Sequence, residues 1–272
     1  MKKRSVVRGE NGMRARDPDA ADDPLFVNAI ERALQVLSAF HRAEQPLSLS
    51  GIAEASGIGR SAAQRIVHTL RTLGYIERDE AGRGYVPGIR ILDHTLDYLR
   101  LNALIERATP VLLDLRKNAR ERVDLSLFDD LRVVYAARLQ SKRETFFATL
   151  VGHSVPTFCT SGGRTIMAHL SDWEVDDIIA RSDRRPFTDK TITAPDEVRE
   201  MVREARQFGY ALTVEEVLVG EVALGVAVLG PGGRPLGAIH IAGSLSEWTP
   251  DAFRTRFAPL AVEAANAINR IR

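Results

Sequence analysis

The chain has 272 residues, which is long enough for two domains with substantial cores. Hydrophobic residues make up 44% and charged residues 27%, as in ordinary soluble globular proteins. The net charge of +1 excludes a globally basic surface, so any nucleic-acid site must be a local patch. No apolar run reaches membrane-spanning length, no signal peptide is recognisable, and the single Cys159 cannot form an internal disulfide. These features predict a cytoplasmic protein without membrane partners.

The N-terminal region is predicted to begin with a disordered tail, residues 1–24, because it carries too few apolar side chains to offset chain entropy. Residues 25–41 have the apolar spacing of a helix, with a stripe made of Ile30, Ala33, Leu34, Leu37 and Phe40. Ser48 is the predicted N-cap of a short helix that ends at Ser56, and Gly57 supplies the tight turn that follows.

The stretch 59–75 is the most informative part of the chain. Its apolar residues recur at helical spacing and form one stripe: Ala63, Ile66, Val67, Leu70 and Leu73. The opposite face carries groups that can read base edges or reach phosphates: Ser61, Gln64, Arg65, His68 and Thr72, flanked by Arg60 and Arg71. Gly74 stands where a left-handed C-cap is required. A short helix, a glycine turn and a second helix with polar residues near its start predict a helix-turn-helix.

The segments 75–78 and 83–87 are short alternating runs around a glycine-bearing turn, which predicts a hairpin. A hairpin directly after a recognition helix is the wing of a winged helix, so residues 25–88 are predicted to form one DNA-binding domain. Arg83 near the hairpin tip is expected to meet a phosphate or the minor groove. The candidate DNA contacts are Arg60, Ser61, Gln64, Arg65, His68, Arg71 and Arg83.

Residues 89–102 are predicted to form a linker helix with one apolar side that joins two copies of the chain. Residues 103–272 then form an α+β domain with helices on one face of a sheet. The expected strands are 123–128, 131–139, 146–151, 210–214, 222–229 and 236–242. The expected helices are 103–120, 161–170, 173–180, a helix from the capped start at 193–196 to Phe208, and a final helix from residue 249. Pro110 is expected near a helix start or kink, and Pro259 is expected to bend or interrupt the last helix.

Five short motifs, in this order, resemble the IclR-type bacterial transcriptional regulators from about Phe26 to the C-terminus. They are IERALQVL at 30–37, TLRTLGY at 69–75, YVPG at 85–88, TSGGRTIMA at 160–168 and GYALTVEE at 209–216. The resemblance implies an α+β protein with an N-terminal winged helix-turn-helix domain, a linker helix and a C-terminal GAF-like α/β effector-binding domain. It also implies assembly as a homodimer or homotetramer on a double-stranded DNA operator.

The resemblance further implies a small organic acid as effector, bound between the sheet and the segments that cover it. The helix that starts at Ser161, Gly162 and Gly163 offers backbone N–H groups and a positive dipole end to a carboxylate. The alternative is that these glycines only form a tight loop before a packing helix. Four residues depart from the family pattern at positions associated with the effector: Thr213, Ala223, His240 and Ala242.

His240 is equally well explained as a core residue or as a ligand contact, and a protonated imidazole there would favour an anion. Phe146 and Phe158 could stack on an aromatic ring, although core packing explains at least one nearby phenylalanine. An aromatic acid is therefore among the candidate effectors. The candidate effector contacts are Phe146, Phe158, Ser161, Gly162, Gly163, Thr213, Ala223, His240 and Ala242.

Two other classes of function remain as alternatives. A hydrolase would use Cys159 as nucleophile with His153 or His169 as base. A protein-interaction module would use the winged helix for protein contacts. The sequence contains no metal-ligand spacing and no phosphate-binding loop, so no cofactor or metal is predicted. A DNA-binding regulator is the preferred function, with repression slightly preferred to activation.

Overall fold

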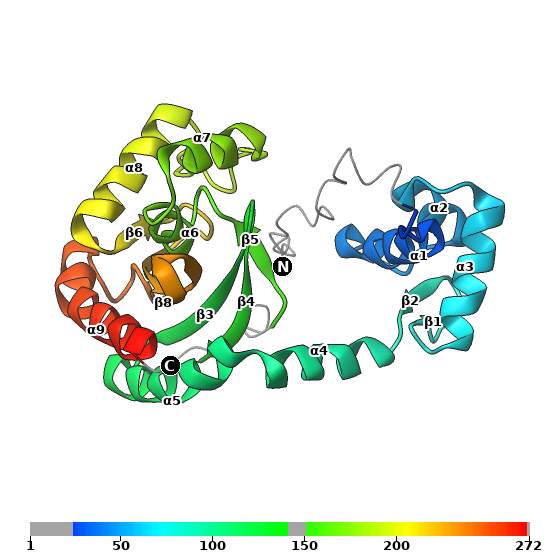
Figure 1. Ribbon diagram of the computed structural model, residues 1–272, viewed down its shortest axis with the longest axis horizontal. Helices are drawn as coiled ribbons and strands as arrows, with labels where there is room; N and C mark the ends of the chain where they lie inside the picture. The colour runs from blue at the N-terminus through cyan, green and yellow to red at the C-terminus, as the bar shows by residue number, and fades with distance from the viewer. Residues whose placement is uncertain (1–23, 141–150, 271–272) are drawn as a thin grey trace. The chain divides into compact units, whose positions relative to one another are not determined.

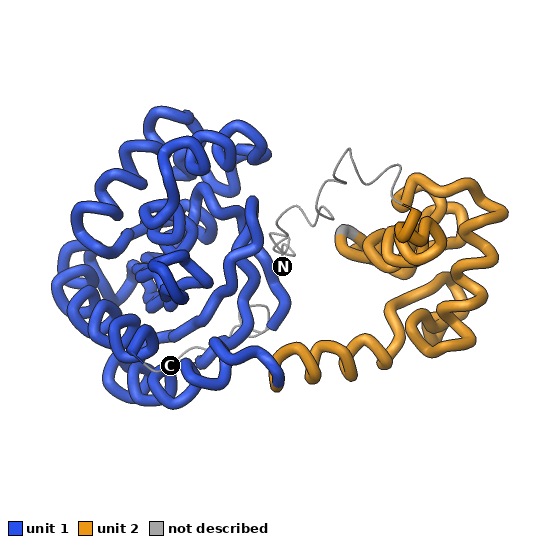
Figure 2. The backbone as a smooth tube through the Cα atoms, in the orientation of Figure 1, with its two compact units in different colours: residues 1–10, 101–272 blue, residues 11–100 orange. Residues whose placement is uncertain are grey.

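The computed structural model describes residues 24–140 and 151–270. The chain separates into two compact units, which meet between residues 100 and 101 (Figure 2). Among the described residues, no helix combines the length and the apolar character needed to cross a bilayer. The predicted disordered tail lies outside the described residues except for its last residue, Pro24.

The first unit contains the predicted helix-turn-helix and its wing (Figure 1). Its elements are α1 (Asn28–Ser38), η2 (Ala39–Arg42), α2 (Leu49–Ser56), α3 (Arg60–Thr72), β1 (Ile76–Arg78), β2 (Tyr85–Pro87) and α4 (Arg90–Leu101). The Ser48 hydroxyl accepts a hydrogen bond of 3.0 Å from the Gly51 N–H, which confirms the predicted cap of α2. Gly57 then adopts a left-handed conformation at φ 67°, so the tight turn between α2 and α3 is also confirmed.

A small apolar core holds the first unit together: Val36, Ala39, Phe40, Ile52, Val67, Leu70 and Ile76. The predicted stripe of α3 is wrong at Leu73, whose side chain is 55% exposed. Leu73 is the C-cap residue beyond the last helical position, so it leaves the stripe. The predicted stripe of α1 is also wrong at Ile30 and Leu34, which are exposed because α1 enters the core through Val36 instead.

The wing is a short antiparallel hairpin in which Ile76 pairs with Pro87 and Arg78 with Tyr85. Leu47 and Tyr85 exchange backbone hydrogen bonds of 3.0 and 2.8 Å, which ties the hairpin to the start of α2. The turn is closed by Asp79, whose carboxylate accepts from the Gly84 N–H at 2.6 Å. This hydrogen bond holds the pKa of Asp79 below its usual value.

The second unit is a six-stranded antiparallel sheet in the order β5-β4-β3-β8-β7-β6. Its strands are β3 (Arg122–Asp129), β4 (Arg132–Leu139), β5 (Ser154–Pro156), β6 (Ala211–Val214), β7 (Glu221–Leu229) and β8 (Pro235–Ser244). Its helices are α5 (Ala103–Ala119), α6 (Ser161–Met167), α7 (Asp172–Arg181), α8 (Pro195–Phe208), the short η4 (Pro231–Gly233) and α9 (Pro250–Arg270). The sequence did not predict β5. The strand predicted at 146–151 lies outside the described residues except for Val151, which is in a turn.

Helices cover both faces of this sheet, which corrects the prediction of helices on one face. α5 and α9 pack against one face, and α6 packs against the other, with α7 and α8 beyond it (Figure 1). The central strand β7 is consequently buried without alternation from Leu224 to Val228. A continuous apolar run of this kind is typical of a strand that is covered on both sides.

Two prolines lie inside helices, contrary to expectation. Pro110 is in the interior of α5, which begins after Asn102, a residue whose side chain accepts from two backbone N–H groups of the first turn. Pro259 lies inside α9 and does not interrupt it. Both prolines are on the exposed side of their helix, where water can satisfy the carbonyl that the missing N–H leaves free.

The start and the buried face of α8 also differ from the prediction. Its N-cap is Ala194, which makes no side-chain cap, and Pro195 occupies the first helical position. The buried residues are Val198, Val202 and Ala205, whereas the predicted core residue Phe208 is 56% exposed. Phe208 is the last residue of the helix, so the stripe ends one turn before it.

The contact between α6 and the sheet is so close that it requires glycine on both sides. A Cβ atom on Gly225 of β7 would lie 2.4 Å from the backbone nitrogen of Gly162. A Cβ atom on Gly162 would lie 2.2 Å from the His240 ring, and one on Gly163 would lie 1.9 Å from the Thr157 carbonyl oxygen. Real Cβ atoms do not approach other atoms this closely, so these glycines serve helix–sheet packing.

We expect Gly225→Ala to destabilise the second unit by about 1–3 kcal/mol, because α6 would have to move away from β7. Thermal unfolding followed by circular dichroism measures this loss. Gly51→Ala is the control, since its Cβ would meet no atom closer than 3.5 Å. A Gly225→Ala protein as stable as the wild type would contradict the close packing.

Candidate DNA-binding face and ligand cavity

The polar face of α3 is exposed and lines a surface hollow of about 640 Å³. Five of the seven candidate DNA contacts line it: Ser61, Gln64, Arg65, His68 and Arg71. Arg60 is exposed at the first position of the helix, outside this hollow. Thr72, the remaining polar residue of the predicted face, uses its hydroxyl to donate to the His68 carbonyl at 2.9 Å.

The charge of this face is not neutralised within its own helix, because α3 contains no acidic residue. Over the described part of the chain, no carboxylate forms a salt bridge with Arg60, Arg65 or Arg71. Guanidinium groups that are exposed and unpaired remain available for the phosphates or base edges of a nucleic acid. The structure therefore presents a local basic patch in a chain of nearly zero net charge.

The wing places two arginines in different situations. Arg78 stacks its guanidinium over the Tyr85 ring at 4.3 Å, which fixes it on the hairpin. Arg83 has a 77% exposed side chain and pairs with Asp79 at 3.5 Å. Exposed ion pairs of this kind contribute little free energy, so Arg83 can exchange its partner for a phosphate.

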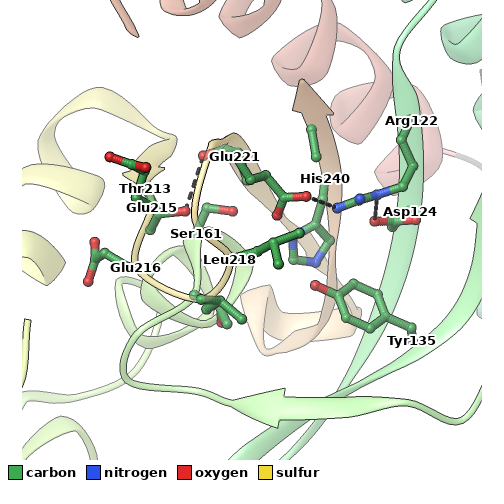
Figure 3. A pocket seen from close by; sticks show the side chains of 14 residues that line it. Arg122, Asp124, Tyr135, Ser161, Thr213, Glu215, Glu216, Leu218, Glu221 and His240 are labelled. Carbon is green, nitrogen blue, oxygen red and sulfur yellow. Dashed lines mark hydrogen bonds and ion pairs between the residues drawn. The ribbon is translucent and has the colours of Figure 1, made fainter. Parts of the chain in front are cut away.

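A second candidate site is a cavity of about 30 Å³ in the second unit (Figure 3). It lies between the sheet, the start of α6 and the loop 215–221 (Figure 3). Its lining residues are Arg122, Asp124, Tyr135, Thr160, Ser161, Thr213, Glu215, Glu216, Val217, Leu218, Glu221, Ala223, His240 and Ala242.

Five of the nine candidate effector contacts line this cavity: Ser161, Thr213, Ala223, His240 and Ala242. Gly162 and Gly163 do not line it, because their backbone packs against the sheet and against Thr157. Phe158 does not line it either, since its ring is buried in the core formed with Met167 and Ile179. Phe146 lies outside the described residues.

A buried charge cluster forms one wall of the cavity. Arg122 donates from Nε to Asp124 at 3.0 Å, and its Nη2 lies 2.9 Å from a carboxylate oxygen of Glu221. Arg138 donates to both oxygens of Asp124 at 3.2 Å. Burial alone would raise the pKa of Asp124, but Arg122 and Arg138 outweigh it, so this pKa lies below its usual value.

His240 is neutral at pH 7, which corrects the expectation that a protonated imidazole attracts an anion. Burial lowers the pKa of His240 to about 4. Its Nε2 atom lies 2.7 Å from the Ser126 hydroxyl, and its ring centre lies 5.4 Å from that of Tyr135. The positive charge of the cavity is therefore carried by Arg122.

The loop that closes the cavity is held by a buried ion pair. Both carboxylate oxygens of Glu216 accept from the Arg164 guanidinium, at 2.6 and 2.7 Å. Glu216 also accepts from the Ile192 N–H at 3.1 Å. Within the loop, the Glu215 N–H donates to the Glu221 carbonyl at 2.8 Å and the Glu215 carboxylate accepts from Gly220 at 2.8 Å.

Sequence reasoning missed most of the charged residues in this cavity, above all Arg122, Asp124 and Glu221. One signal was available in β3, where Arg122, Asp124 and Ser126 alternate and must share one face. A polar row on a strand in an otherwise apolar sheet indicates a site or a buried network. The partner Glu221 lies 99 residues away in the chain, so no local pattern connects it to this row.

The hydrolase alternative is not supported by the position of Cys159. Its side chain is fully buried, and burial raises the pKa of the thiol, whereas a nucleophilic cysteine needs an accessible thiolate. In the portion of the chain that the structure covers, no group of three side chains is arranged to hold a metal ion.

Comparison with known proteins identifies the same two segments. Residues 29–80 match the IclR helix-turn-helix domain, and residues 96–270 match the C-terminal domain of the bacterial transcriptional regulator IclR. The chain is 26% identical over 244 residues to the Pca regulon regulatory protein of Pseudomonas putida, covering 89% of this chain and 83% of that protein. It is 22% identical over 259 residues to the transcriptional repressor IclR of Escherichia coli, covering 94% of each.

A solved structure shares the fold. An IclR homologue from Microbacterium hydrocarbonoxydans, crystallised with 4-hydroxybenzoate, superposes with a TM-score of 0.70 at 19% identity, covering 89% of this chain and 97% of the homologue. The winged helix-turn-helix, the six-stranded sheet domain and the family matches over most of the chain agree. The protein therefore belongs to the IclR family of transcriptional regulators, with a DNA-binding helix-turn-helix domain.

Proposed function

We propose that the protein is a repressor that binds a specific operator and whose DNA affinity responds to a small organic acid, with aromatic acids among the candidates. The observation that carries the DNA-binding part is the exposed, unpaired polar face of α3 beside the wing. The repressor direction is supported by the Escherichia coli relative, which is a repressor. The acid effector is supported by the 4-hydroxybenzoate complex of the structural neighbour.

On DNA, α3 would enter the major groove with its first turns nearest the bases. Ser61, Gln64 and Arg65 lie on these turns and are the proposed base-edge contacts, and His68 lies on the next turn of the same face. The proposed phosphate or minor-groove contacts are Arg60, Arg71 and Arg83.

A homodimer or homotetramer would place two copies of α3 about 34 Å apart, or a multiple of that distance, on a near-palindromic operator. The linker helix α4 fits a role in assembly, because it has no buried residue within its own chain and exposes Leu92 and Leu96 on one side. At its start α4 is tied to the DNA-binding unit by the stacking of His94 on Tyr75, with ring centres 5.5 Å apart.

In the second unit, an acid effector would occupy the cavity beside Arg122, whose guanidinium suits a carboxylate. Ser161 and Thr213 supply hydroxyl groups to the same cavity, and burial raises the pKa of Tyr135 to about 12, so its phenol stays protonated. A volume of about 30 Å³ holds one or two water molecules, so an aromatic acid requires the loop 215–221 to move. This movement is the proposed link between ligand binding and DNA affinity.

Gln64→Ala is expected to weaken operator binding by about 1–3 kcal/mol and to relax specificity at one base pair, because it removes a base-edge contact. Arg71→Ala is expected to weaken binding to every sequence alike and to flatten the salt dependence. Fluorescence anisotropy on the upstream region of the protein's own gene measures both effects. Arg100→Ala is the control, since Arg100 lies on α4 and pairs with Asp97 on the surface.

The double variant Gln64→Ala, Arg65→Ala separates the regulator from a winged helix that binds only proteins. A regulator must lose its preference for the promoter over random duplex in this variant. Unchanged promoter affinity would favour the protein-interaction alternative and contradict the assignment of the α3 face.

A further inference from the structure

The Arg122 guanidinium bridges two carboxylates that differ in how firmly they are held (Figure 3). Asp124 has a side chain that is 1% exposed and is also bound by Arg138 through both of its oxygens. Glu221 has a side chain that is 19% exposed, and among the described residues its carboxylate pairs with Arg122 alone. Asp124 is thus a fixed part of the cluster, whereas Glu221 can leave it without stranding a buried charge.

Charge balance makes the Glu221 position the place for an incoming anion. Arg122 and Arg138 carry two positive charges, and Asp124 and Glu221 carry two negative charges, so the cluster as it stands is neutral. If Glu221 turned away, the cluster would hold one unbalanced positive charge at the wall of the cavity. A buried guanidinium in that state attracts a carboxylate with suitable hydrogen-bond geometry.

We propose that Glu221 occupies the binding position of the effector carboxylate on Arg122 and acts as an internal competitor of the ligand. The inference rests on the proposed acid effector and names the residues that bind its carboxylate. An acid enters by taking the Arg122 Nη2 contact that Glu221 holds at 2.9 Å, and the displaced Glu221 turns toward solvent. Glu221 thereby sets how tightly acids bind and which ligands the cavity rejects.

The same exchange transmits binding to the loop. Glu221 is the first residue of β7, and its backbone carbonyl accepts from Glu215, so its side chain and the loop end move together. The apex residues Leu218 and Val219 are exposed and contribute little to the core. At the other end, Glu216 stays bound to Arg164. Displacement of Glu221 therefore opens residues 217–221 while the anchor at Glu216 holds.

The test compares wild type with Glu221→Gln by isothermal titration calorimetry. The probes are acetate, benzoate and 4-hydroxybenzoate, with benzamide as neutral and benzamidine as cationic analogue. Glutamine keeps a side chain of the same shape but cannot neutralise Arg122, so each acid that binds should bind about ten-fold more tightly to the variant. Benzamide affinity should stay the same. Asp251→Asn is the control, because it removes one carboxylate from an exposed pair with Arg254.

Three outcomes would overturn the inference, and they differ in what they say about the proposed function. Acids that bind wild type and Glu221→Gln equally would exclude competition by Glu221 and leave the acid effector intact. Benzamidine binding that is lost in Glu221→Gln would show that Glu221 is a ligand contact for cations. The absence of acid binding in both proteins, with operator binding retained, would reject the acid effector together with the role of Glu221.

Amide hydrogen exchange gives a second readout that a merely structural Glu221 would not move. Saturating benzoate or 4-hydroxybenzoate should speed exchange at residues 217–221 in wild type. In Glu221→Gln without ligand, these residues should already exchange faster, while Ile192 and its neighbours around the Glu216 anchor stay protected. Equal exchange in all four samples would contradict the proposed displacement.

Discussion

The buried ion pair between Arg164 and Glu216 is the contact on which the ligand-binding unit depends. It joins α6 to the loop between β6 and β7 and is almost completely withdrawn from water. Removing one partner would leave an uncompensated charge in the interior, which costs far more free energy than the pair itself contributes. This constraint fixes one end of the loop that covers the cavity. The other end is left to the weaker, partly exposed contact between Glu221 and Arg122.

The two units treat charge in opposite ways. In the second unit, the guanidinium groups that line or adjoin the cavity are paired with carboxylates, as burial requires. In the first unit, α3 exposes arginines without acidic partners over the described residues. Unpaired charges at a surface cost little in water and gain free energy when counterions are released from DNA. The distribution of pairing therefore separates a surface suited to DNA from a cavity suited to a small ligand.

The sequence predicted those parts of the fold that depend on neighbours along the chain. The Ser48 cap, the left-handed Gly57 and the hairpin of the wing follow from local chemistry, and the structure has all three. The family resemblance supplied the order of the two domains. Core positions at helix ends, such as Leu73 and Phe208, were wrong because the period continues in the sequence after the helix has ended.

The cavity was only half predictable, because its chemistry depends on contacts between distant segments. The residues that face it from β7 and β8 were found through the family pattern, but Arg122 and Glu221 come from strands that meet only in the folded sheet. The glycines before α6 were assigned to a ligand, and the structure uses them for packing. The protonation of His240 was unpredictable from sequence, since burial decides it.

The central claim is that two copies of the α3 face bind an operator in a manner controlled by the ligand cavity. DNase footprinting of the region upstream of the protein's own gene, with and without aromatic and aliphatic acids, tests this claim most directly. The account predicts two protected half-sites whose centres lie about 34 Å apart or a multiple of it, and protection that weakens when an effective acid is added. Uniform protection of all fragments, unchanged by any acid, would contradict it.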